Sequence, residues 1–169
     1  KEEARNTQLQ TAVMISQIQP HFLYNSLNTI AALCENDPKR AKEATVAFSD
    51  YLRANMDSLS RMSPVTFETE LEHVKTYLWL EQIRFPDKLA VRYDIRCTRF
   101  FLPALSLQPI VENAVKHGVC RKKGGGTVTI GTYETEEAYY VTVRDDGIGF
   151  DPEQAFSGDR AHIGIENVR

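Results

Sequence analysis

The chain has 169 residues and a formal net charge of −3 at pH 7, with charged residues of both signs mixed along its length. A chain of this length forms either one domain or a helical part of about 60 residues joined to an α/β part of about 100, and its apolar patterns favour the second arrangement. The mixed charge lacks the basic surface that binding to phosphate backbones requires, so nucleic acid is not an expected partner.

The cysteines and the apolar runs indicate the cellular compartment in which the chain folds. Cys34, Cys97 and Cys120 include no CxxC pair, which argues against a disulfide framework or a zinc cluster and favours a reducing compartment. No apolar run approaches the roughly 20 residues of a membrane span, and no signal peptide is visible. Since the sequence begins at Lys1 and ends at Arg169 inside what reads as a helix, we expect a piece of a longer protein whose membrane or sensing region precedes Lys1.

Two helices are predicted in the first third of the chain. Long periodicity without glycine predicts one helix over residues 2–34, bent at Pro20 because proline lacks an N–H and clashes with the preceding turn. Asp37 and Pro38 are typical of an N-cap and a first helical position, so a second helix follows to about Ser60. Its apolar stripe consists of Ala41, Ala44, Phe48, Tyr51, Leu52 and Met56. Two helices alone bury too little surface for stability, so we expect a second copy of the chain to complete a four-helix bundle.

One histidine lies among amides on the first helix. At about 100° per residue, the polar stripe consists of Gln17, His21, Asn25 and Asn28. The flanking positions that can pack are Ile18, Phe22, Leu23, Leu27 and Ile30. His21 is therefore expected to face outward with both ring nitrogens available, and the bend at Pro20 fixes the direction of its imidazole. An exposed histidine at a bent helix indicates chemistry rather than packing.

The rest of the chain alternates helices and strands. Thr66, followed by acidic residues, predicts the start of a third helix that Phe85 and Pro86 end. The pattern then predicts a strand over 89–95, a helix over 104–118 with a glycine C-cap, and strands over 127–133 and 138–144 joined by a turn. The basic and glycine residues over 121–126 read as a solvated flexible loop.

Four polar side chains gather near the end of the helix predicted over 104–118. They are Glu112, Asn113, Lys116 and His117, and they fall within little more than one turn. An amide oxygen and a carboxylate are hard ligands suited to Mg²⁺, and a lysine supplies positive charge for phosphates. The cluster therefore indicates a nucleotide and metal site, although a partly solvated helix face would give the same pattern.

Two glycine-containing segments follow this helix. The sequence Asp145-Asp-Gly-Ile-Gly149 ends a strand, and its glycines let the backbone pass close to a planar ligand while Asp145 accepts a hydrogen bond from a purine amino group. The same Asp-Asp-Gly sequence is also typical of an ordinary turn. After a polar loop, the segment around Gly164 opens a helix whose N-terminal N–H groups favour phosphate. The presence of all three segments in this order favours a nucleotide site.

These residues resemble the motifs of a known superfamily. Residues 112–118, 145–149 and 164–168 resemble the N, G1 and G2 boxes of the GHKL ATPases, which include DNA gyrase and the histidine kinases. Residues 20–25, with the sequence Pro-His-Phe-Leu-Tyr-Asn, resemble the phosphoacceptor region of the LytS-like sensor histidine kinases. The resemblance covers nearly the whole chain.

The resemblance implies a fold and a reaction. The fold is α+β, with a dimerisation and phosphoacceptor hairpin over 1–62 that forms a dimeric four-helix bundle. A GHKL-type α/β sandwich that binds ATP follows over 63–169 and is incomplete at its C-terminus. By this resemblance His21 is autophosphorylated from ATP with Mg²⁺, and the phosphoryl group passes to an aspartate in the receiver domain of a response regulator. The chain is then a homodimer and the cytoplasmic portion of an inner-membrane protein.

The site residues follow from this resemblance together with the chemistry of the polar stripe and the polar cluster. The catalytic residues are His21 and Asn25, whose amide lies one helical turn after the histidine. The nucleotide-binding residues are Asn113, Lys116, His117, Asp145, Gly147, Gly149 and Gly164, and the metal ligands are Asn113 and Glu112. Asp145 binds the adenine amino group, Asn113 holds Mg²⁺, and Gly164 begins the phosphate side of the lid.

Departures from the family pattern leave other functions open. Phe22 follows the histidine where many histidine kinases have an acidic residue. Pro109 lies one turn before the box asparagine where many GHKL proteins have an acid or an amide, which leaves Glu112 or Gln108 as substitutes. Phe22 and Pro109 favour a non-catalytic dimeric relay that binds nucleotide only to set its shape. The amide-rich stripe favours a phosphatase of the regulator, in which Asn25 positions a water. His73 and His117 are weaker candidates for the phosphoacceptor.

Overall fold

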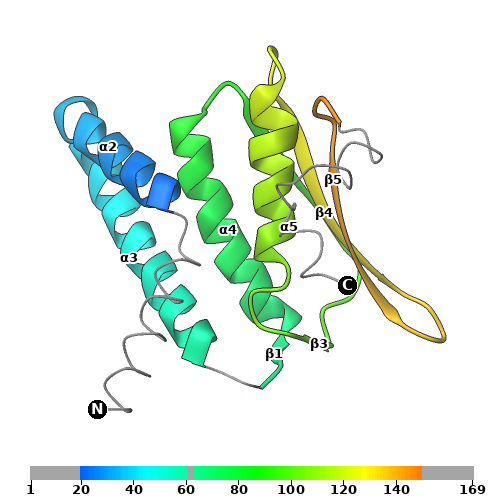
Figure 1. The fold of residues 1–169 in the computed structure, drawn as a ribbon. Coiled ribbons are helices and arrows are strands. Elements are labelled where there is room, and N and C mark those ends of the chain that lie inside the picture. The colour runs from blue at the N-terminus through cyan, green and yellow to red at the C-terminus, as the bar shows by residue number, and fades with distance from the viewer. Residues whose placement is uncertain (1–19, 61–62, 150–169) are drawn as a thin grey trace, which may run out of the picture. The chain divides into compact units, whose positions relative to one another are not determined.

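Two compact units make up the chain. The computed structural model describes residues 20–60 and 63–149 (Figure 1). The units are Lys1–Met62 and Ser63–Arg169. A helical part precedes a part with both helices and sheets, which confirms the predicted α+β class. The predicted helix before Pro20, its bend, and the predicted role of Gly164 lie outside the described residues. Within those residues, no helix is both long and apolar enough to cross a membrane.

The first unit contains a helical hairpin. Helix α2 spans Pro20–Asn36 and helix α3 spans Pro38–Ser60. Asp37 separates the two helices, and its Oδ1 accepts a hydrogen bond from the Arg40 N–H at 3.0 Å. The carboxylate thus satisfies one of the N–H groups that have no partner within the helix. The predicted N-cap is therefore confirmed.

Aromatic packing joins the two helices. The Phe22 side chain is buried, and its ring centroid lies 4.9 Å from that of Tyr51 and 6.3 Å from that of Phe48. Ala41 and Ala44 are buried earlier on the same stripe of α3, as predicted.

The end of the predicted stripe is not buried within one hairpin. Met56 is 57% exposed in the described chain, whereas Asn55 is buried. Asn55 lies four residues after Tyr51 and therefore on the same helix face, while Met56 lies about 140° away from Tyr51. The buried amide is not left unsatisfied, because Asn55 Nδ2 donates to the Tyr51 carbonyl at 2.9 Å.

The second unit places helices against a mixed sheet. Its elements in chain order are β1 (Val65–Thr66), α4 (Phe67–Arg84), β2 (Leu89–Ile95), β3 (Phe101–Leu102), α5 (Gln108–Asn113), the π-helical turn η1 (Ala114–Gly118), the 3-10 turn η2 (Val119–Arg121), β4 (Gly126–Glu134) and β5 (Tyr139–Asp145). The sheet order is β2-β4-β5, with β2 parallel and β5 antiparallel to the central strand β4. The three strands agree with the predicted ones to within about one residue, as expected for element ends. The short antiparallel pair of β1 and β3 was not predicted, because two-residue strands leave no periodic pattern.

The core of this unit lies between the sheet and helices α4 and α5, which lie side by side against one face of the sheet (Figure 1). Alternate residues of β4 point to that face, and Val128, Ile130 and Thr132 are fully buried there. Val74 and Tyr77 of α4 are also fully buried.

Helix α4 begins and ends as predicted. The Thr66 hydroxyl accepts a hydrogen bond from the Thr69 N–H at 3.3 Å. Glu68 and Glu70 lie in the first turn, where carboxylates interact favourably with the helix dipole. The helix ends at Arg84, before the Phe-Pro sequence.

The helix predicted over 104–118 is shorter and less regular in the structure. It begins at Gln108 because Leu105 has a φ of 58° and cannot lie in a right-handed helix. The buried Glu70 carboxylate accepts the Leu105 N–H at 2.7 Å and the Leu107 N–H at 3.2 Å. These two bonds fix the backbone that leads into α5. The glycine C-cap is wrong, because Gly118 has φ −88° and ψ −86° and the chain continues into η2.

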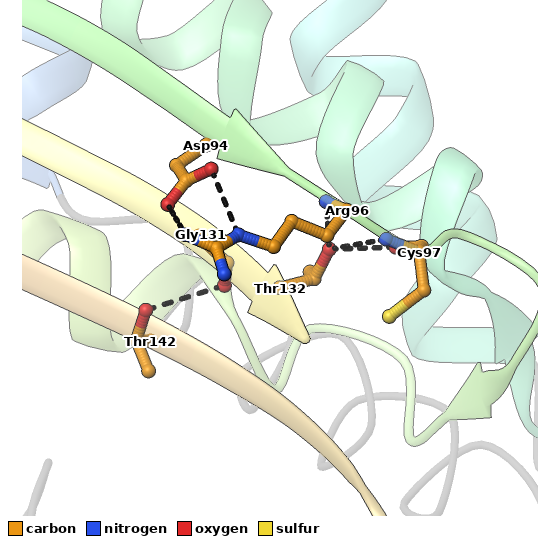
Figure 2. A network of polar contacts seen from close by, with 6 residues as sticks. All are labelled: Asp94, Arg96, Cys97, Gly131, Thr132 and Thr142. Atoms are coloured by element: carbon orange, nitrogen blue, oxygen red, sulfur yellow. Dashed lines mark hydrogen bonds and ion pairs between the residues drawn. The ribbon is translucent and has the colours of Figure 1, made fainter. Parts of the chain in front are cut away.

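A buried hydroxyl ends the pairing of β2 with β4 (Figure 2). Thr132 Oγ1 accepts the N–H groups of Arg96 and Cys97 at 3.2 and 3.1 Å and donates to the Cys97 carbonyl at 2.6 Å. Beside it, the exposed guanidinium of Arg96 pairs with both carboxylate oxygens of Asp94 at 3.3 and 3.1 Å. The hydroxyl replaces partners that the backbone loses where the strand leaves the sheet.

Candidate functional site

His21 lies exposed on the first turn of α2, beside an amide. The Asn25 Nδ2 atom lies 2.9 Å from Nδ1 of His21 and 3.2 Å from its Nε2. The amide therefore lies within hydrogen-bond distance of both ring nitrogens and can orient the ring. The structure thus brings together the two residues that sequence analysis placed in the catalytic role, one helical turn apart.

The neighbouring residue explains why His21 faces outward. Phe22 is 2% exposed and packs on Tyr51, and Ser26, one turn later, is buried on the same face. Successive residues of a helix point about 100° apart, so burial of Phe22 turns His21 away from the core. The position directly after the histidine therefore serves packing in this chain.

The polar cluster on α5 and η1 divides between two environments. Asn113 and His117 are exposed, whereas Glu112 is buried and Lys116 is half-buried. The Gln108 Nε2 atom donates to Glu112 Oε1 at 2.7 Å. Asn113 is thus accessible to a ligand, while the Glu112 carboxylate is engaged within the fold.

Lys116 lies among carboxylates of two helices. Burial lowers the pKa of Lys116, and the charges of Glu112 and of Glu81 on α4 oppose that shift. Burial raises the pKa of Glu81, against the effects of Arg84 and Lys116, and the Arg84 Nη1 atom lies 3.5 Å from Glu81 Oε1. Sequence analysis missed Glu81, because a Glu–Arg pair three residues apart on a helix is an ordinary surface pattern.

Asp145 ends β5 with an exposed carboxylate. Its Oδ1 accepts the Gly147 N–H at 3.0 Å. A carboxylate offers about four lone-pair sites, so this bond leaves capacity for a further donor.

The two glycines after Asp145 are required for different reasons. A Cβ atom on Gly147 would overlap with the Cα, C and O atoms of Gly118, so the absence of a side chain permits this close approach. The Ile148 N–H also donates to the Gly118 carbonyl at 3.4 Å. Gly149 has open space around it, but its φ of 68° is a conformation that other residues rarely adopt.

The fold therefore joins two of the segments that sequence analysis selected. Gly118, which directly follows His117, contacts the turn that begins at Asp145. Sequence analysis assigned Gly118 to a helix end and missed this contact, which no local pattern signals. Gly164 lies outside the described residues.

Two family models match the chain. The model described as Histidine kinase matches residues 9–89. The model described as Histidine kinase-, DNA gyrase B-, and HSP90-like ATPase matches residues 104–164. The chain belongs to the histidine kinase family. The first match includes the helix that carries His21, and the second includes Asn113 and Asp145.

Relatives support the same family. The chain is 39% identical to the YwpD protein of Bacillus subtilis, over 96% of this chain and 60% of the relative. It is 41% identical to the sensor histidine kinase YpdA of Escherichia coli and 35% identical to the sensor protein LytS of Staphylococcus haemolyticus. These alignments cover 81% and 82% of this chain but 24% of each relative. The predicted resemblance to LytS-like sensor histidine kinases is confirmed.

One solved structure resembles the chain more distantly. The histidine kinase AdeS of Acinetobacter baumannii aligns over 89% of this chain and 77% of its own, with 13% identity and a TM-score of 0.41. A TM-score this low does not decide the fold.

Proposed function

We propose that this chain is the catalytic region of a sensor histidine kinase, in which His21 is phosphorylated from ATP and passes the phosphoryl group to an aspartate of a response-regulator receiver domain. The contact between the exposed His21 ring and the Asn25 amide at 2.9 Å carries the proposal. It orients the imidazole, a potential nucleophile, at the surface where a nucleotide can reach it.

The proposed transfer is an in-line displacement. A ring nitrogen of His21 forms a bond to the γ-phosphorus of ATP, and the bond from that phosphorus to the bridging oxygen breaks as ADP leaves. The ring nitrogen that does not attack keeps its proton. Asn25 lies within reach of both nitrogens, so its amide would orient the ring before the attack and move off the attacking nitrogen as the bond to phosphorus forms.

The second unit would hold the nucleotide. Asp145 is proposed to accept the adenine amino group with the capacity that the Gly147 N–H leaves free. Gly147 and Gly149 would shape the pocket, and Lys116, His117 and Gly164 would lie on the phosphate side. The half-burial of Lys116 strengthens its interactions, although Glu112 and Glu81 compete with phosphates for its charge.

The donor set at Asn113 fits Mg²⁺. Its amide oxygen is a hard donor on an exposed side chain, and Mg²⁺ in nucleotide sites takes one or two protein ligands besides phosphates and water. When bound there, Mg²⁺ would neutralise phosphate charge. The role of Glu112 as a second ligand stays a prediction, since its carboxylate is buried and bonded to Gln108.

A homodimer is part of the proposal. Large apolar side chains remain exposed on the hairpin, namely Tyr24, Leu27, Val46 and Met56. A second hairpin would cover such residues in a four-helix bundle. The expected result is that the whole chain is dimeric by light scattering and that a fragment beginning at Ser63 is monomeric. A dimeric fragment would contradict the bundle. The location on the cytoplasmic side of a membrane stays a prediction of the resemblance.

A phosphatase role for the same site is the second candidate. The Asn25 amide lies at the histidine ring, where it could also orient a water toward the phospho-aspartate of a docked regulator. The relay that binds nucleotide without catalysis rests on Phe22 and Pro109 and stays a prediction.

Labelling tests the proposal directly. The chain is incubated with γ-labelled ATP and Mg²⁺, and the labelled residue is mapped after proteolysis at neutral pH. We expect acid-labile label on His21. Label on His73 or His117, or no label with ATP bound, would contradict the assignment of the phosphoacceptor.

A further inference from the structure

The helix side of the acidic turn (residues 145–147) rests on Gly118. A Cβ atom on Gly118 would overlap with Asp145 Oδ1 and lie 2.7 Å from its Cγ. Gly147 lies against the Gly118 backbone at the same point. Gly118 therefore provides the surface on which the Asp145 carboxylate and the next glycine are seated.

The other side of the acidic turn is held by the basic loop (residues 121–126), which the sequence predicts to be a solvated flexible loop. Lys122 Nζ donates to the Asp146 carbonyl at 2.7 Å and lies 3.8 Å from Asp146 Oδ1. The same Oδ1 accepts the Thr127 N–H at 2.7 Å, and it occupies the space that a side chain on Gly126 would need. The Asp146 N–H donates back to the Thr127 carbonyl at 3.3 Å.

The basic loop is itself fixed to the fold. Gly125 has a φ of 68°, and a Cβ atom there would overlap with the Lys88 carbonyl. The Gly126 N–H donates to that carbonyl at 2.9 Å, and the Gly125 N–H donates to the Lys122 carbonyl at 3.0 Å. A loop with these bonds can hold the turn in one place, which a flexible linker cannot.

We propose that Gly118 and Lys122 are positioning residues of the nucleotide site: they hold the acidic turn from two sides and so place the Asp145 carboxylate. The inference rests on the proposed function, because Asp145 is the proposed adenine contact. A side chain that is placed before the ligand arrives loses less freedom on binding, so a fixed turn raises affinity and selectivity for the base.

The contacts predict graded effects on nucleotide affinity. Gly118→Ala should weaken ATP binding by about tenfold or more, because the added methyl displaces the carboxylate. Asp146→Ala removes the acceptor of the Thr127 N–H and should cost about fivefold to tenfold, whereas Asp146→Asn keeps an oxygen there and should recover most of that loss. Lys122→Met should cost about twofold to fivefold, since the ammonium is partly exposed.

Two matched controls come from the same loop. Gly124→Ala adds the same methyl as Gly118→Ala, but no atom lies within 4 Å of its Cβ position. Lys123→Met removes the same charge as Lys122→Met from an exposed neighbour. Both controls should bind ATP like the unaltered chain.

Calorimetry of the whole chain with Mg²⁺-ATP and Mg²⁺-GTP tests the proposal, with thermal melting of each variant. We expect lower ATP affinity and a smaller preference for ATP over GTP in Gly118→Ala, Lys122→Met and Asp146→Ala. Loss through unfolding would lower the number of sites and the melting temperature without changing the preference. If Gly118→Ala does not fold, Lys122→Met, Asp146→Ala and Asp146→Asn still test the positioning role.

The outcomes distinguish a failure of the proposed adenine contact from a failure of the positioning role. If the unaltered chain binds ATP with no preference over GTP, or binds neither, the proposed role of Asp145 fails and the positioning role fails with it. If the unaltered chain prefers ATP and the three variants retain both its affinity and its preference, the positioning role alone is overturned.

Discussion

The two regions of this protein that carry its proposed chemistry are built over different ranges of sequence. The His21–Asn25 contact joins residues four apart on one helix. The contacts of the acidic turn join residues 19 and 24 apart, from Asp146 to Thr127 and to Lys122. The first arrangement follows from helix geometry, whereas the second exists only when β4, β5 and the basic loop have come together.

This difference predicts how mutations in the two regions should differ in their effects. A change at the acceptor helix removes one group and leaves the fold around it, because the helix backbone is satisfied by its own hydrogen bonds. A change in the acidic turn also alters how separate segments meet. Variants of the first region should therefore lose a particular activity. Variants of the second region should lose nucleotide affinity to different degrees.

The largest effect is expected at the acceptor. His21→Gln should abolish acid-labile phosphorylation, because glutamine has no ring nitrogen to attack phosphorus. ATP affinity should stay within about threefold, since the proposed adenine contact lies in the other unit. Labelling with γ-labelled ATP and calorimetry of the same preparation measure the two quantities. Phosphorylation that persists in the variant would place the acceptor elsewhere.

The next effect concerns the amide beside the histidine. If Asn25 orients a water for attack on the regulator's phospho-aspartate, Asn25→Ala should lower the phosphatase rate by about 10² or more, the scale of losing a group that positions the nucleophile. Autophosphorylation should fall much less. The rates of label loss from a phosphorylated regulator and of self-labelling are compared. Equal losses would mean that Asn25 only orients the His21 ring.

The adenine contact gives a smaller and graded effect. Asp145→Asn should weaken ATP binding by roughly 1.5 to 3 kcal/mol, the cost of losing a charged hydrogen-bond partner. GTP lacks the matching amino donor, so its affinity should be spared. Titration with both nucleotides measures the difference, and equal losses for the two would count against an adenine contact.

The smallest effect is expected at the entry to α5. In Glu70→Gln one carboxylate oxygen is replaced by a donor, so one of the N–H groups of Leu105 and Leu107 loses its acceptor, at a cost of about 1 to 2 kcal/mol in the free energy of unfolding. Burial raises the pKa of Glu70 above its ordinary value of 4.5, against the effect of the backbone hydrogen bonds. The contribution of this group to the free energy of unfolding is therefore fully present below about pH 4.5. It falls as the pH rises through the higher pKa of the folded state.

Urea unfolding of the two proteins at about pH 4 and about pH 7 measures this. The difference in the free energy of unfolding between the unaltered chain and Glu70→Gln should be larger at the lower pH. Glu68→Gln is the control, because Glu68 is exposed in the same helical turn. A gap that widens toward neutral pH would contradict the direction of the pKa shift.

Much of this fold could be predicted from local patterns. Asp37 and Thr66 mark helix starts, because a short polar side chain at an N-cap bonds to a nearby N–H whatever surrounds it. Strand β4 shows the alternation of a half-buried strand. The burial of Asn55 rather than Met56 within one hairpin was not predicted, because it depends on which residue faces the other helix of the hairpin.

The sequence by itself determined the exposed histidine with its amide, the order of the nucleotide segments and the family, since each depends on residue type and short spacing. Only the tertiary structure decided that Gly118 seats the acidic turn, that Lys122 holds it, and that Lys116 lies near Glu81. These contacts join residues far apart in the chain. Their existence depends on how β4, β5 and the helices pack, and no periodicity within one segment records that packing.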